Sequence, residues 1–85
     1  MTEISLSRQA LSLKPGIYRH YKGKKYRVIG VAIHTETMEE LVVYQALYGK
    51  NALWARSLKM FLETVTAGKE SQPRFKFLSP EAFSE

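Results

Sequence analysis

The stretch Tyr26–Tyr48 constrains the fold more than any other part of this chain. It contains two long segments, YRVIGVAIHT and ELVVYQALY, joined by the acidic turn sequence ETMEE. Their content of Val and Ile favours a pleated, half-buried strand over a helix. In the second segment the polar residue Gln45 lies between Tyr44 and Ala46, so we expect the even-numbered positions to face inward. The stretch therefore predicts two long β-strands.

Both strands are apolar on both faces, which shapes the rest of the prediction. Leu41, Val43 and Leu47 occupy the odd positions of the second strand and also need cover. Gly30, in the middle of the first strand, offers a place where the sheet can bend. A sheet that curls on itself meets both demands.

The remaining chain supplies shorter elements. Proline, glycine and lysine clusters mark turns between further expected strands at Ile17–Tyr21, Ala52–Arg56 and Arg74–Leu78, and we expect the chain to straighten at Thr64–Thr66 without a strand being assigned there. We expect one helical turn at Ser57–Phe61 and a polar loop at Ala67–Pro73. The predicted fold is mainly β, a small, strongly bent antiparallel barrel of the SH3 or Tudor type, with an oligonucleotide-binding barrel as the competing topology.

The length allows one domain. The chain has 85 residues, of which 45% are hydrophobic and 25% charged, as in ordinary globular proteins. We expect a flexible N-terminal arm over residues 1–13, a single barrel domain over 14–78 and a frayed tail over 79–85. The sequence has no cysteine, no long apolar run and no signal-peptide pattern at its start. We therefore expect a monomeric cytoplasmic protein without a membrane segment.

The charge distribution is uneven. The formal net charge is +5, and an acid-free basic segment contains Lys14, Arg19, Lys22, Lys24, Lys25 and Arg27. Such a segment attracts phosphate backbones. Lysines at turns and edge strands also protect a soluble sheet from edge-to-edge pairing, and this structural interpretation is the stronger one.

Several short motifs together resemble a known family. They are a His-Tyr-Lys-Gly turn, a His-Thr-Glu-Thr loop, a Val-Tyr strand ending in Leu-Tyr-Gly, and a Trp-x-Arg segment, at His20–Gly23, His34–Thr37, Val43–Gly49 and Trp54–Arg56. Over Leu13 to Leu78 the chain resembles the bacterial family catalogued as domain of unknown function 1653. The resemblance implies a compact β domain, commonly a stand-alone bacterial protein, and no assigned activity. Ser57 departs from the family pattern, which tends to have proline there.

Catalytic and metal-binding interpretations have little support. His34 and Glu36 are two residues apart and share one face if the strand continues that far, and His20 could lie nearby across a hairpin. A zinc site needs three protein ligands, and this spacing does not supply a third. The chain has no aspartate, nucleophile elbow or phosphate-binding glycine loop. We expect no metal and no cofactor, and a small enzyme using His34 with Glu36 or Glu40 stays an alternative.

The aromatic residues are the strongest functional signal. Trp54 and Arg56 share a strand face, and tryptophan and arginine favour recognition surfaces. We expect a non-enzymatic binding module whose surface includes Tyr48, Trp54 and Arg56, with His34, Glu36, His20 and Lys22 at its rim. A protein or peptide partner is slightly favoured over single-stranded RNA or DNA, because Glu36, Glu39 and Glu40 would repel phosphate nearby.

Overall fold

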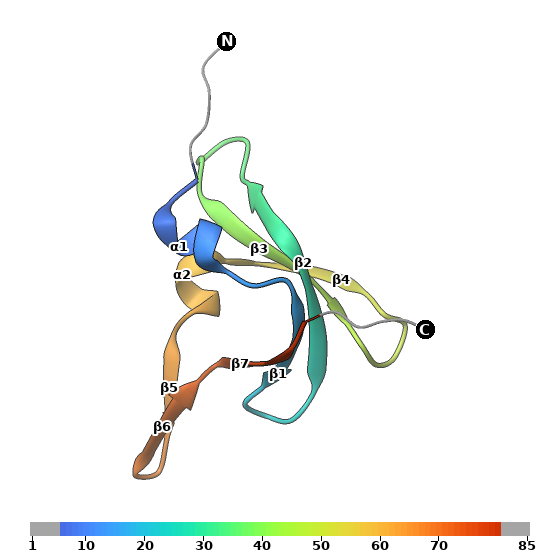
Figure 1. The fold of residues 1–85 in the computed structure, drawn as a ribbon, viewed down its shortest axis with the longest axis vertical. Coiled ribbons are helices and arrows are strands. Elements are labelled where there is room, and N and C mark those ends of the chain that lie inside the picture. The colour runs from blue at the N-terminus through green and yellow to red at the C-terminus, as the bar shows by residue number, and fades with distance from the viewer. Residues whose placement is uncertain (1–5, 81–85) are drawn as a thin grey trace.

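The computed structural model describes residues 6–80, except for the side chain of Ala67. It shows a mainly β fold (Figure 1). In chain order the elements are α1 (Arg8–Ser12), β1 (Gly16–His20), β2 (Lys25–Ile33), β3 (Glu40–Ala46), β4 (Leu53–Ser57), α2 (Leu58–Phe61), β5 (Thr64–Ala67), β6 (Glu70–Pro73) and β7 (Phe75–Ser79). The predicted mainly β class is confirmed. Met1–Ser5 and Glu81–Glu85, which include most of the expected C-terminal tail, lie outside the described residues.

Five of the strands form one antiparallel sheet in the order β4-β3-β2-β1-β7. The other two, β5 and β6, form a hairpin that projects from the rest of the fold (Figure 1). Within residues 6–80, β4 and β7 are the first and last strands in the order of this sheet. Closure of this sheet into a barrel stays a prediction.

A β-bulge in β2 places its apolar residues. Val28 lies opposite Tyr44 and Val31 opposite Val42, and between them the register shifts by one residue. Ile29 is the extra residue, and it is 52% exposed, whereas Val28 is 1% exposed. The bulge therefore turns both Val28 and Val31 toward the core although they are three positions apart, beside the glycine where a bend is expected.

The core lies on the face of the sheet that carries the even-numbered residues of β3. Val42, Tyr44 and Ala46 are buried, as the alternation predicts. The short helices α1 and α2 cover part of this face through the buried residues Ala10, Leu58 and Phe61. The Phe61 ring stacks on Phe75, with 4.2 Å between ring centroids. On the outer face of the sheet the odd-numbered residues of β3 are only half-buried.

The helical turn expected after β4 is present as α2. Ser57 caps its N-terminus by accepting a hydrogen bond from the Met60 N–H at 3.1 Å. Ser57 therefore begins this helix as its N-cap, because its hydroxyl accepts a hydrogen bond from a backbone N–H of the first turn, which a proline side chain could not do.

The polar loop predicted at Ala67–Pro73 is wrong. The segment is instead the turn and second strand of the β5–β6 hairpin, in which Ala67 pairs with Glu70 and Thr66 with Ser71. Gly68 adopts a φ of 67°, which allows the tight two-residue turn. The pattern gave no sign of this strand because all of β6 is exposed and has no apolar alternation.

Residues before β1 contact the sheet. Ser7 caps α1, and its N–H and hydroxyl both donate to the Glu40 carboxylate at 2.7 Å. These hydrogen bonds lower the pKa of Glu40. Leu6 and Leu13 pack against the core on either side of α1. In the described part of the chain the two helices have five and four residues, and neither is long and apolar enough to span a membrane.

Candidate functional site

The candidate site is the part of the inner sheet face that α1 and α2 leave uncovered. Trp54 and Arg56 of β4 lie directly opposite Tyr44 and Val42 of β3, so they project from the same face as the core residues. Trp54 is nevertheless 52% exposed, because β4 is an edge strand. We define the aromatic face by its members His20, Tyr21, Tyr26, Tyr48, Trp54 and Arg56, which lie around the buried core residue Tyr44.

Tyr26 lies at the centre of the aromatic face. Its ring makes edge-to-face contacts with Tyr44, Tyr48 and Phe75, with centroid distances of 5.3, 5.5 and 5.7 Å. Its hydroxyl is 2.6 Å from that of Tyr48. Burial, followed by this hydrogen bond, raises the pKa of Tyr26 to about 12. The phenol is therefore neutral at physiological pH and holds Tyr48 in place.

Cationic side chains lie over this aromatic surface. The Arg56 Nε donates to the Tyr44 hydroxyl at 3.2 Å, and its guanidinium carbon is 5.6 Å from the centre of the Phe75 ring. The Lys24 Nζ is 4.6 Å from the centre of the Tyr48 ring. Both are within the range of a cation–π interaction. The result is a surface that offers flat rings and positive charge together.

His20 contributes to the aromatic face as a neutral ring. It packs against Tyr21 at 4.6 Å and Phe75 at 4.9 Å between centroids, and its Nδ1 accepts the Lys22 N–H at 3.2 Å. Burial lowers the pKa of His20, and the nearby charges of Arg56, Arg74 and Lys22 lower it further. The imidazole is therefore held in the form that carries no charge at neutral pH.

His34 and Glu36 lie at the other end of the sheet. His34 follows the last residue of β2, whereas Tyr26 is near its start, so the two are about 26 Å apart along the strand. The His34 Nδ1 accepts hydrogen bonds from the backbone N–H groups of Glu36 and Thr37 at 3.1 and 3.3 Å. These contacts organise the β2–β3 turn, which lies at the end of the sheet away from His20, Lys22 and Tyr48.

The structure places Tyr48 against Tyr26, and His20 and Lys22 around Tyr21, at the end of the sheet where β1 and β2 meet. Trp54 and Arg56 lie further along the sheet, opposite Tyr44 and Val42, and the Arg56 side chain reaches the Tyr44 hydroxyl. The structure adds Tyr26, Lys24 and Tyr21, which the sequence reasoning did not select as site residues. The sequence could have indicated Tyr26, because it is two residues from the apolar Val28 and therefore lies on the same face of the strand. Among residues 6–80, no group of three His, Cys, Asp or Glu side chains comes together to hold a metal ion.

Comparison with known proteins places this geometry in a family. Residues 16–77 match the family described as "Protein of unknown function (DUF1653)". This chain belongs to the DUF1653 family. A crystal structure of a DUF1653 protein from Bordetella bronchiseptica is similar, with a TM-score of 0.78 and 38% sequence identity, covering 88% of this chain and 99% of that one. Comparison with proteins of curated function gave no match.

The matched residues contain all of the aromatic face, from His20 in β1 to Arg56 in β4. The family resemblance inferred from the motifs is therefore confirmed, and so is the β-rich fold that it implied. The DUF1653 description assigns no activity, so a function has to be argued from the site itself.

Proposed function

We propose that this DUF1653 protein is a non-enzymatic module that binds single-stranded RNA or DNA on its aromatic face. The observation that supports this most is the exposed Trp54 ring beside Arg56, on the sheet face that also carries Tyr26 and Tyr48. Bases of single strands stack on exposed aromatic rings, and cations beside them contact the phosphates. The proposal includes a cytoplasmic location, where such strands are available.

The position of the acidic residues supports a nucleic acid. Glu36, Glu39 and Glu40 counted against phosphate binding when only the sequence was considered. They lie in and after the β2–β3 turn, at the end of the sheet opposite Tyr48. The remaining carboxylate near this surface, that of Glu63, forms an ion pair with Arg74 at 3.1 Å. The electrostatic objection to a nucleic acid is therefore weakened.

The shape of the sheet is part of this proposal. We infer that the bent five-stranded sheet over residues 14–78 corresponds to an incompletely closed barrel of the SH3 or Tudor class, with α2 inserted before its last strand. Small barrels of this kind present a curved surface on which extended ligands lie across several strands. The aromatic face, which crosses β1, β2, β3 and β4, has this character.

A peptide partner is the second candidate, and one observation favours it. Strand β4 pairs only with β3 among the described residues, so its other edge offers free backbone groups next to Trp54 and Arg56. An extended peptide can add a strand to such an edge. The small-enzyme alternative has less support, because His34 and Glu36 lie in the β2–β3 turn, where the His34 Nδ1 and the Glu36 N–H are used to organise the turn backbone.

The test is an amide-resolved NMR titration of the labelled protein with short single-stranded RNA and DNA. We expect saturable shifts at Tyr26, Tyr48 and Trp54 and none in the β2–β3 turn. If Lys22, Lys24 and Arg56 contact phosphates, the affinity for a single strand falls roughly twenty-fold between about 50 and about 200 mM salt. An absence of shifts at low salt would rule out the proposed function.

A further inference from the structure

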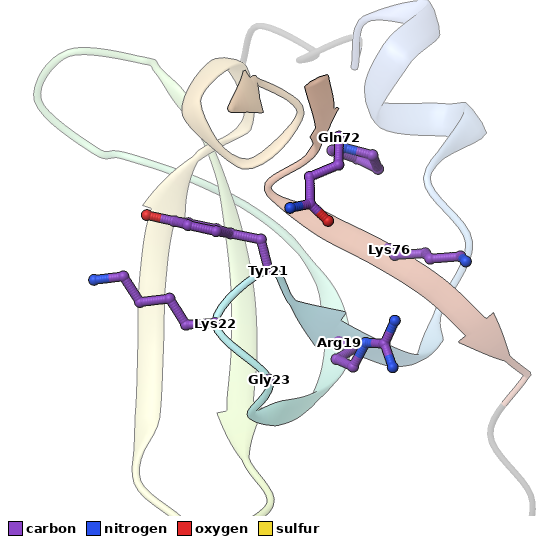
Figure 2. Close-up of a pocket in the computed structure, with 7 residues that line it drawn as sticks. Arg19, Tyr21, Lys22, Gly23, Gln72 and Lys76 are labelled. Atoms are coloured by element: carbon purple, nitrogen blue, oxygen red, sulfur yellow. The ribbon is translucent and has the colours of Figure 1, made fainter. Parts of the chain in front are cut away.

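A separate pocket lies where the β1–β2 turn meets β6 and β7. Its volume is about 440 Å³, and its lining includes Arg19, Tyr21, Lys22, Gly23, Gln72 and Lys76. Figure 2 shows Arg19 and Lys76 extending on one side of the turn and Tyr21 and Lys22 on the other, with Gln72 above. The lining contains three cationic side chains and no carboxylate.

The cations on the outer face are aligned across three strands. Arg19 of β1 is in register with Lys76 of β7 on one side and with Lys25 of β2 on the other. Cross-strand partners have Cβ atoms about 4.5–5.5 Å apart, and like charges at this spacing destabilise a sheet. All three side chains are exposed, and no carboxylate within residues 6–80 forms an ion pair with them. The fold thus carries a row of positive charge that an anion would neutralise.

Protection of the sheet edge explains only part of this row. Lys76 is on the edge strand β7, where a lysine discourages pairing with another chain. Arg19 is on β1, which is hydrogen-bonded on both sides. Its charge has no edge to protect, and its planar guanidinium is suited to holding a phosphate through two hydrogen bonds.

We infer that this pocket binds a terminal phosphate monoester, held by Arg19 and Lys76, at the end of a strand lying on the aromatic face. A terminal monoester carries nearly two negative charges at neutral pH, one more than an internal phosphodiester, and therefore suits paired cations better. Tyr21 joins the two sites, because it lines the pocket and its ring packs against His20 of the aromatic face. The link to a strand rests on the proposed function, whereas recognition of the phosphate group does not.

The test compares thymidine hexamers that carry a 5′-phosphate, a 3′-phosphate or no terminal phosphate, with thymidine monophosphate and inorganic phosphate as free ligands. We expect one phosphorylated hexamer to bind roughly tenfold more tightly than the unphosphorylated one. Arg19→Gln and Lys76→Gln should each remove most of this advantage. Lys59→Gln is the matched control, since it removes one exposed charge from α2, outside the pocket.

Stability measurements separate loss of the site from loss of the fold. Because Arg19→Gln removes a like-charge contact, the variant should unfold at a temperature equal to or above that of the wild type while binding terminal phosphate more weakly. Equal affinity of all three hexamers would overturn the strand-end proposal even if they bind the aromatic face. NMR shifts at Arg19 and Lys76 that occur with thymidine monophosphate or inorganic phosphate, but not with the phosphorylated hexamers, would overturn the link to a strand end. They would assign the pocket to small phosphate compounds. No shift with any phosphate would overturn the site itself.

Discussion

Replacing Trp54 by alanine separates recognition from folding. Trp54 is 52% exposed on an edge strand, so about half of its surface is buried and its removal should cost about 1–3 kcal/mol of folding free energy. Loss of one base-stacking platform should cost about 1–3 kcal/mol of binding free energy, or a weakening of about 5- to 150-fold. Trp54→Ala should therefore bind a single strand poorly while remaining folded.

The neighbouring residue Leu53 gives the matched control. It is 63% exposed and lies on the same strand, but it is in register with Gln45 and projects from the outer face. Fluorescence anisotropy of a labelled hexanucleotide should give Leu53→Ala an affinity within about twofold of the wild type, as expected for a residue outside the contact surface. Urea unfolding of both variants provides the stability comparison. Equal affinities for Trp54→Ala and Leu53→Ala would refute stacking on Trp54.

Two further predictions concern the fold and its pH dependence. Phe61 is 1% exposed and stacks on Phe75, so Phe61→Ala should lower the free energy of unfolding by about 3–5 kcal/mol in urea titrations. Met60→Ala is the control, because Met60 is exposed and its replacement should change the free energy of unfolding little. A cost near zero for Phe61→Ala would contradict the core described above. The pKa of His20 is lowered below 6.5 in the folded state, so the unfolded state takes up this proton first. The contribution of His20 to the free energy of unfolding should therefore be constant above about pH 6.5. It should fall as the pH drops from about 6.5 toward the pKa of His20 in the folded state. This slope should be smaller in His20→Gln, and an identical slope in the variant would show that His20 is not its source.

The parts of the fold that follow from periodicity were predictable from the sequence. The alternation around Gln45 correctly placed Val42 and Tyr44 inside, and the spacing of Phe75 and Phe77 correctly predicted a strand with one apolar face. The β5–β6 hairpin was missed because polar strands that project into solvent leave no apolar alternation. Gly30 indicated a bend, but the register shift at Ile29 depends on pairing with β3, which a single strand does not reveal.

The placement of the candidate residues could be predicted where they share one strand, and it could not where it depends on how separate strands pair. Trp54 and Arg56 are two apart on β4, so their common face followed directly. His34 was grouped with them by residue type, yet the length of β2 separates it from Tyr26 and Tyr48. Lys24 comes from a turn, and its position over Tyr48 depends on how three strands end together. Contacts between residues at the ends of different strands leave no periodic pattern in the sequence.

The most direct measurement uses the intrinsic fluorescence of Trp54, since it is the chain's single tryptophan. If bases stack on the aromatic face, adding unlabelled single-stranded RNA or DNA at low salt should quench this fluorescence saturably, and added salt should reverse the quenching. Duplex DNA of the same length should quench much less, because its bases are already stacked on each other. Unchanged Trp54 fluorescence with saturating single strands at low salt would contradict recognition of nucleic acid by this face.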